Sequence, residues 1–194
     1  MMKTKHFIIT LFLVGSFLLL QGLYFYSKGA IVQYIISGSF DDSDTFGVSI
    51  KKKITQEIFG IKPIGRIKIP SINIDQTILE GSTQKILAYG PGKIINNYQL
   101  HNENSNIVIS GHRDSFFRNL KHIKINDIIF IEHTKGKSKY EVVQIIKDLD
   151  PDLPENVKYL DENIPNILTL VTCYPFDFIG SAPKRYLVIA KLII

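Results

Sequence analysis

The chain has 194 residues, of which 45% are hydrophobic and 21% are charged. This composition can bury a core and is unlike that of an intrinsically disordered protein. The formal net charge of +5 is concentrated at the start, since residues 1–28 hold three lysines and no acid, whereas the other 166 residues carry 20 basic and 18 acidic side chains. The nearly neutral body therefore argues against nucleic acid as a partner. A single cysteine, Cys173, excludes a disulfide framework and a zinc site built on several thiolates.

Residues 7–26 form an uncharged run of twenty residues. At about 1.5 Å per residue, such a helix crosses a hydrocarbon layer of roughly 30 Å. A cleaved signal peptide is the alternative, but the run is longer than the usual apolar segment of about 7–15 residues, so a retained transmembrane anchor is favoured. Lys3 and Lys5 precede the run and only Lys28 follows it closely. The positive-inside rule then predicts a cytoplasmic N-terminus at residues 1–6 and a single-pass protein of the cell membrane with an extracytoplasmic body.

Residues 27–62 are predicted to be a tether between the anchor and the folded body. An acidic, turn-rich stretch at residues 40–47 is followed by Ile50, Ile54 and Ile58, which share one face of a helix that stops at Gly60. Three isoleucines in one stripe need an apolar surface to cover. We therefore expect this amphipathic helix to lie on the neighbouring domain.

From residue 63 onward, short runs of β-type residues alternate with Gly, Pro and Asn, which indicates a mainly β domain over residues 63–194. Strands so closely spaced are typical of a single barrel or sandwich, here with short helical turns at 82–88 and 115–120. The expected strands cover residues 65–69, 72–79, 107–110, 125–133, 139–147, 167–173 and 185–194.

Cys173 ends one of these strands, because Pro175 prevents the strand from continuing. A buried and inert thiol is the plain alternative to a reactive one. Arg185 opens the next strand after an eleven-residue connection. Antiparallel pairing would place it opposite Cys173, with Cβ atoms about 5 Å apart, and would set a permanent cation with several N–H donors beside the thiol. An ordinary surface cation is the alternative for Arg185.

His112 follows another strand end, directly after Gly111, which permits a close approach of the backbone. An ordinary loop histidine is the alternative. A thiolate, an imidazole and a guanidinium at three strand ends suit attack on a peptide carbonyl: the sulfur attacks, the imidazole moves protons and the guanidinium stabilises the oxyanion.

Residues 169–173, Thr-Leu-Val-Thr-Cys, match the Thr-Leu-x-Thr-Cys motif of the sortases. Over residues 63–194 the chain resembles this family of membrane-anchored cysteine transpeptidases of Gram-positive bacteria. His112, in Ser-Gly-His-Arg, and Arg185 match the family's other two catalytic residues, and residues 173–185 are most similar to class D. The resemblance implies a sortase-type barrel of eight strands with short helices.

The resemblance also implies cleavage of an LPXTG-like sorting signal on a secreted protein. Cys173 would form a thioacyl-enzyme with the threonine of the motif, which an amine of a peptidoglycan precursor would resolve. Thr172 would add a side-chain or backbone contact to the oxyanion held by Arg185. Leu153 and Pro154 lie in the segment 149–159, which matches the wall of the sorting-signal groove; a plain surface loop is the alternative.

No cofactor is predicted to be required. Some sortases depend on calcium, but the acidic residues that could hold it show no ligand spacing, so no metal site is predicted and stimulation by a divalent cation stays open. These residues are Glu103, Asp150, Asp152 and Glu155. An L,D-transpeptidase would need a Ser-His-Gly-Cys context and a papain-like hydrolase a cysteine that precedes its histidine, and neither is found. A non-enzymatic barrel that binds wall components is the third competing interpretation.

Overall fold

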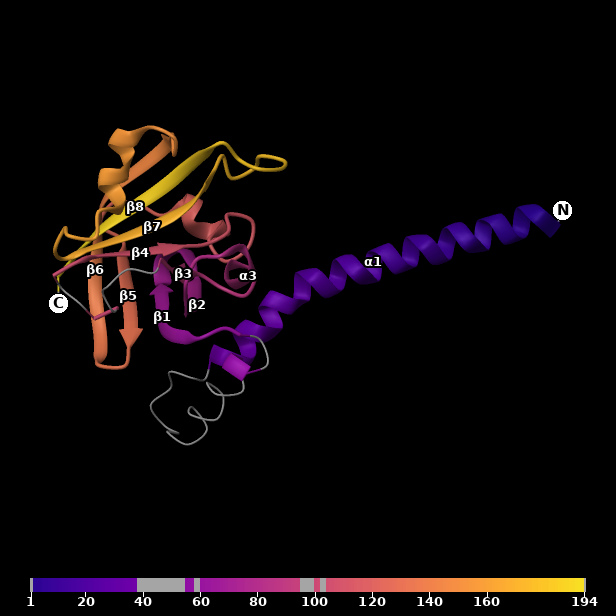
Figure 1. Cartoon of the computed structure of the whole chain (residues 1–194), viewed down its shortest axis with the longest axis horizontal. Coiled ribbons are helices and arrows are strands. Elements are labelled where there is room, and N and C mark those ends of the chain that lie inside the picture. Colours follow the sequence, from indigo (N-terminus) through magenta and orange to yellow (C-terminus); the bar gives the residue numbers. More distant parts are fainter. Residues whose placement is uncertain (1, 38–54, 58–59, 95–99, 102–103, 194) are drawn as a thin grey trace.

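The computed structural model describes residues 2–37, 55–57, 60–94, 100–101 and 104–193, and it shows a β-barrel from which one long helix projects (Figure 1). This helix is α1 (Met2–Ser37). It contains a stretch, Lys5–Tyr24, that is long and apolar enough to cross a membrane, and none of that stretch is buried in the protein. The predicted fold, a mainly β barrel preceded by an apolar helix, is confirmed.

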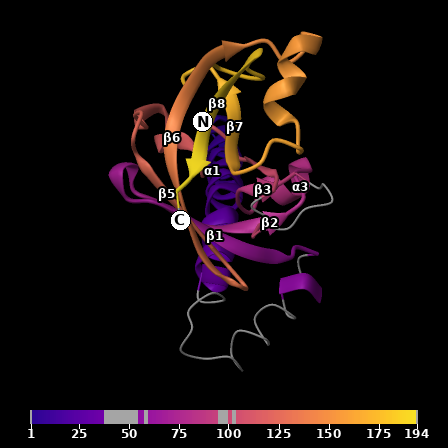
Figure 2. The same ribbon diagram turned by 90° about the vertical axis from the view of Figure 1, so that its left-hand side faces the viewer.

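Eight strands close the barrel in the order β1-β2-β3-β4-β7-β8-β6-β5. Most neighbours are antiparallel, but β2 pairs with β3, and β4 with β7, in parallel. Figure 2 shows the barrel with α1 running away behind it. The strands are β1 (Pro63–Ile69), β2 (Ile74–Glu80), β3 (Gly92–Lys93), β4 (Asn106–Ser110), β5 (Ile128–His133), β6 (Gly136–Leu149), β7 (Ile167–Tyr174) and β8 (Lys184–Leu192).

Short helical segments join the strands, and two of them match the helical turns expected from the sequence. They are η2 (Pro70–Ile72), α3 (Gln84–Leu87), η3 (Arg118–His122) and η4 (Pro154–Leu160). The strand expected from Ile72 starts at Ile74 instead, because Pro70 opens the η2 turn and Asn73 adopts a left-handed φ of 53°. The two-residue strand β3 and the helix η4 were not expected from any pattern in the sequence.

Alternation of side chains builds the barrel core. In β1, Ile67 and Ile69 are fully buried, whereas the alternate residues Ile64, Arg66 and Lys68 are half-buried. Among the described residues, every strand except β3 contributes apolar side chains to this core, and Phe117 and Leu120 close it from the connection between β4 and β5. The period-two pattern in the sequence therefore reports a barrel with one face of each strand inside.

The last turns of α1 belong to the folded domain. Gly29, Val32, Gln33 and Ile36 are buried and share one helix face. Val32 and Ile36 form a second apolar cluster with Ile61, Leu79 and Tyr89 of the barrel side. The boundary predicted at residue 27 thus lies within a continuous helix. The predicted amphipathic helix at residues 50–58 lies mostly outside the described residues; of these positions, 55–57 are described and are helical.

The side-chain amide of Gln33 completes the open edge of β2. Its Nε2 donates to the carbonyls of Thr77 (3.1 Å) and Tyr89 (2.9 Å), and its Oε1 accepts from the N–H of Thr77 (2.9 Å). Strand β3 pairs with β2 only at Leu79 and Glu80. At Thr77, beyond the reach of β3, the Gln33 amide therefore makes the backbone hydrogen bonds that a longer strand would make. A Cβ at Gly90 would collide with Gln33 Nε2, which explains the glycine there.

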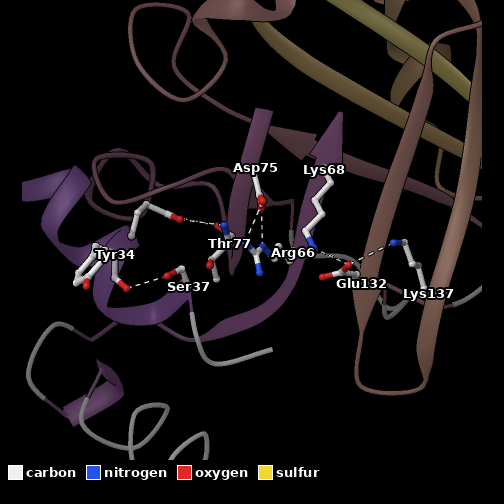
Figure 3. A network of polar contacts seen from close by, with 9 residues as sticks. Tyr34, Ser37, Arg66, Lys68, Asp75, Thr77, Glu132 and Lys137 are labelled. Atoms are coloured by element: carbon white, nitrogen blue, oxygen red, sulfur yellow. Dashed lines mark hydrogen bonds and ion pairs between the residues drawn. The ribbon is translucent and has the colours of Figure 1, made fainter. Parts of the chain in front are cut away.

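Charged side chains of β1, β2 and β5 lie beside the contact between α1 and Thr77 (Figure 3). Arg66 of β1 forms a two-armed ion pair with Asp75 of β2, and Lys68 pairs with Glu132 of β5 at 2.9 Å. An open cleft of about 340 Å³ lies next to this contact and is lined by residues of α1, β1 and β2, among them Gln33 and Thr77. Water can therefore reach the neighbourhood of the docked amide.

Candidate active site

Cys173 and Arg185 lie directly opposite each other on β7 and β8. The pairing is antiparallel, as the sequence predicted, and opposed residues in such a pair point to the same face of the sheet. On β7, Leu168 and Leu170 face the core, so by alternation Cys173 points to the outer face. Its thiol is free and half-exposed. The alternative of a thiol enclosed by the core therefore does not describe this cysteine.

His112 comes beside Cys173 through the parallel pairing of β4 and β7. Ser110 pairs with Val171, and the N–H of Gly111 continues the ladder by donating to the Val171 carbonyl at 3.1 Å. His112 is the next residue after Gly111, just beyond the end of the paired part of β4. The three residues that the sequence singled out therefore occupy adjacent strand ends, two of them directly paired.

The turn that carries His112 is fixed by close packing. A Cβ at Gly111 would lie 2.7 Å from the ring of Phe117, so only glycine lets this buried ring cover the turn. The His112 carbonyl accepts from the Phe117 N–H at 3.0 Å, which closes the turn. The glycine for which the sequence left a close approach or an unusual turn open thus lies against the Phe117 ring.

Thr172 links the cysteine strand to that same turn. Its side chain is 3% exposed, and its Oγ1 donates to the Gly111 carbonyl at 2.7 Å. It therefore faces the opposite side of β7 from Cys173. The sequence predicted a side-chain or backbone contact from Thr172 to the oxyanion. Because the hydroxyl already donates to the Gly111 carbonyl, this stays a prediction for the backbone N–H.

The guanidinium of Arg185 is held by the loop that follows Cys173. Its Nη1 donates to the carbonyls of Ala182 (3.2 Å) and Lys184 (2.9 Å). These bonds fix one arm of the fork near the start of β8. Holding one arm in this way keeps the direction of the remaining N–H donors of Arg185 defined.

The segment between β6 and β7 packs along the outer face, with Leu153 46% exposed and Pro154 opening η4. Asn106 Nδ2 donates to the Tyr159 carbonyl at 3.1 Å, and Thr169 Oγ1 donates to Asn106 Oδ1 at 2.8 Å, so η4 is tied to β4 and β7. The predicted substrate contacts of Leu153 and Pro154 stay predictions.

An ion pair fixes the start of this segment next to the cysteine strands. Lys184 Nζ lies 2.7 Å from Asp150 Oδ2. The hydrogen bond from Lys184 lowers the pKa of the Asp150 carboxyl, and the same bond raises the pKa of Lys184. Asp150 also accepts from the Asp152 N–H at 3.0 Å, so this carboxylate, a candidate calcium ligand in the sequence, is occupied by protein donors.

No group of three or more His, Cys, Asp or Glu side chains suited to a metal ion is found within the part of the chain that the structure describes. Glu103, another acid considered for calcium, lies outside the described residues. That no cofactor is required stays a prediction, and stimulation by a divalent cation stays open.

Sequence reasoning missed Arg113, which binds the loop between β7 and β8 (residues 175–183). Its Nε donates to the Phe176 carbonyl at 3.3 Å, and its Nη2 donates to the carbonyls of Phe178 and Gly180. The residue follows His112 directly and thus joins two of the three strand ends. The only signal in the sequence was an arginine next to a candidate catalytic histidine, which does not reveal a partner more than sixty residues away.

The chain is therefore a closed eight-stranded β-barrel protein whose candidate active site combines one free cysteine with a histidine and an arginine on adjacent strand ends. A sequence model described as the Sortase domain matches residues 67–193, and the chain belongs to the sortase family. The predicted resemblance is confirmed by this match.

The relatives include members of class D. The chain is 37% identical to Sortase D of Bacillus subtilis over 127 residues, which is 66% of this chain and 62% of that protein. Among solved structures, a Clostridium perfringens Sortase D5 transpeptidase superposes with a TM-score of 0.64 at 28% identity, covering 87% of this chain and 99% of the other. The catalytic domain of Bacillus anthracis SrtD gives a TM-score of 0.56 at 31% identity, covering 68% and 88%. The match spans less than two thirds of the Bacillus subtilis protein.

Proposed function

We propose that this protein is a membrane-anchored cysteine transpeptidase. It cleaves an LPXTG-like sorting signal of a secreted protein and transfers the new carboxyl end to an amine, which we take to be that of a peptidoglycan precursor. The observation that carries the proposal is the direct pairing of Cys173 with Arg185, with His112 on the neighbouring strand end. Membership of the sortase family supports the same chemistry.

In the first half-reaction, the Cys173 thiolate attacks the carbonyl carbon of the threonine in the sorting signal and forms a C–S bond. The free N–H donors of Arg185 stabilise the resulting oxyanion. The C–N bond then breaks, and His112 in its imidazolium form gives a proton to the departing amine. The product of this step is a thioacyl-enzyme.

In the second half-reaction, neutral His112 accepts a proton from the incoming amine as its nitrogen attacks the thioacyl carbon. The C–S bond breaks, the new amide leaves, and the thiolate and imidazolium are restored. The proposed steps need no metal or organic cofactor, and a stimulatory divalent cation stays open.

We further propose that α1 is retained as the anchor, with residues 1–6 in the cytoplasm and the barrel outside. The apolar and unburied stretch of α1 supports this topology. It would place the barrel on the same side of the membrane as secreted substrates.

The test uses the full chain in lipid nanodiscs, an LPXTG-type peptide and an oligoglycine amine, with amide exchange followed by mass spectrometry. Cys173→Ala should abolish exchange, and Arg185→Lys should lower the rate by about 100-fold or more because a lysine keeps the charge but loses the fork. Lys191→Ala, which alters an exposed basic residue on the same strand, is the control and should match the wild type. Exchange that persists without Cys173 would refute the nucleophile, and no exchange with any peptide of a sorting-signal library would favour a wall-binding module.

A further inference from the structure

The docking of α1 determines how far the barrel stands from the membrane, given the proposed insertion of that helix. The apolar stretch ends at Tyr24. The barrel reaches α1 at Gly29, where a Cβ would lie 2.8 Å from the Ala88 carbonyl oxygen and 3.1 Å from the Phe116 ring. Five residues of helix rise about 7.5 Å. Because each headgroup layer is about 5–8 Å thick, the side of the barrel that contacts Gly29 lies at the level of the lipid headgroups.

The loop between β7 and β8 points to that same side. In Figure 1 this loop extends from the barrel in the direction in which α1 runs toward its N-terminus. Its tip carries two exposed apolar side chains, Phe178 at 44% exposure and Ile179 at 97%. A nearly fully exposed isoleucine next to an exposed phenylalanine is a feature that calls for a partner surface.

Arg113 forms hydrogen bonds with backbone carbonyl groups at this tip, which lowers the cost of moving the tip into a medium of low polarity. Carbonyl groups without partners are costly near lipid. The carbonyls on both sides of Ile179, those of Phe178 and Gly180, accept from Arg113 Nη2. The isoleucine is therefore presented with its flanking backbone acceptors already paired. Arg113 itself sits on the connection whose Phe116 touches α1 at Gly29, so the loop is tied to the segment nearest the membrane.

The charge of the connection between β4 and β5 agrees with a lipid surface as the partner, since residues 111–127 carry four basic and two acidic side chains. Arg118 and Lys121 are exposed on the same connection, and basic side chains near a bilayer are attracted to anionic headgroups. Asp177, next to Phe178, is also exposed. A carboxylate at that position restricts the tip to the interface and excludes deep burial in hydrocarbon.

We propose that Phe178 and Ile179 insert into the headgroup interface of the membrane that holds α1, and that Arg113 positions the loop for this contact. The barrel then rests on the bilayer at two places, α1 and the loop tip. Cys173 and Arg185 stand at the two ends of this same loop. Their outer face would open close to the lipid surface, where a substrate that is itself held in the membrane arrives.

Insertion is tested with full-length Cys173→Ala protein in nanodiscs, which removes the native thiol and needs no catalysis. Single cysteines at Ile179, Val143 and Leu18 receive an environment-sensitive fluorophore, and the lipids carry a nitroxide quencher near the headgroup. Val143 is 48% exposed on β6 and Leu18 lies in the apolar stretch of α1, so they serve as negative and positive controls. The label at 179 should be quenched and blue-shifted relative to 143. Equal signals at 179 and 143 would overturn the proposal, as would an unquenched label at 18, which would refute the anchor as well.

The role of Arg113 is tested in discs of phosphatidylcholine alone, where general charge attraction is weak. Arg113→Ala should lower quenching at 179, Arg113→Lys should restore part of it, and Arg118→Ala should change nothing. In unlabelled enzyme with Cys173 intact, Ile179→Ser should raise the KM for a lipid-tethered sorting peptide by about tenfold while leaving a soluble peptide unaffected. Equal losses on both peptides would mean that the loop acts on catalysis and not on the membrane. Full activity without quenching at 179 would refute the insertion and leave the transpeptidase function standing.

Discussion

Replacing Gln33 by alanine tests whether the end of the anchor helix is part of the catalytic domain. The substitution removes both donors and the acceptor that meet Thr77 and Tyr89. Three backbone groups would lose their partners at a site where Gln33 is only 8% exposed. The helix itself should persist, because alanine is a good helix former.

The expected cost follows from those three groups. A buried polar group without a partner costs about 1–3 kcal/mol, which would give up to about 9 kcal/mol if all three stayed dry. The neighbouring cleft of about 340 Å³ is open, so water can pair with part of them. We therefore expect a loss of about 2–4 kcal/mol, a large part of the roughly 5–15 kcal/mol that stabilises a typical domain.

The assay is urea unfolding of the full chain in detergent micelles. The chain has nine tyrosines and no tryptophan, and six of the tyrosines lie in residues 63–194, so the loss of near-ultraviolet circular dichroism on unfolding reports mainly on the barrel domain, over a constant background from the three tyrosines of α1. With a urea slope of about 2 kcal/mol per molar, the midpoint should fall by about 1–2 M. Gln33→Glu should be at least as harmful, because it turns the amide donor toward Thr77 and Tyr89 into an acceptor. Tyr34→Ala, at a side chain 82% exposed on the same helix, is the control. A Gln33→Ala midpoint equal to that of the control would refute the docking role.

Three further predictions concern the same framework and the walls of the site. Gly90→Ala should displace Gln33 and destabilise by a similar amount, and the double variant should be no worse than the poorer single one, as unfolding midpoints would show. Burial lowers the pKa of His133 from its ordinary value of 6.5, helped by the charges of its neighbours, so the fold loses stability as pH falls below about 6.5; His133→Gln should flatten that part of the thermal stability profile. Because the pKa of the Asp150 carboxyl is lowered, its ion pair with Lys184 stays formed as pH falls through the ordinary carboxyl range and is lost only at still lower pH. Asp150→Asn should raise the KM for a sorting peptide a few-fold at neutral pH, with little change in melting temperature.

The sequence predicted the barrel because its signal is local. Alternation along β1 and the other long strands reflects which side chains face the core, and period two is readable in a few residues. Strand β3 could not be predicted in this way, since it has only two residues, Gly92 and Lys93, and no period can be seen in two positions. The start of β2 was wrong by two residues for a different reason, a left-handed Asn73 whose conformation depends on the preceding turn.

The reactive residues of the site could be predicted from the sequence, but most of the contacts that hold the surrounding segments in place could not. Cys173 and Arg185 could be paired from the sequence because a single loop joins their strands, and the register is then nearly forced. The contacts of Gln33 with Thr77 and of Arg113 with the β7–β8 loop join segments 44 and 63–67 residues apart. Nothing local to either residue records such a partner, so only the folded barrel reveals it.

The segment that leads into η4 and the β7–β8 loop are held by different side chains, Asp150 and Arg113, so the independence of their effects can be tested. Asp150 binds Lys184 on the side of η4, and Arg113 binds the Phe176, Phe178 and Gly180 carbonyls on the side of the β7–β8 loop. The hydrogen bonds and ion pairs found for Asp150 and for Arg113 share no residue. Effects of Asp150→Asn and Arg113→Ala on kcat/KM for a lipid-tethered sorting peptide should therefore multiply, to within about a factor of two. A marked departure from the product would show that the segment held by Asp150 and the loop held by Arg113 are energetically coupled.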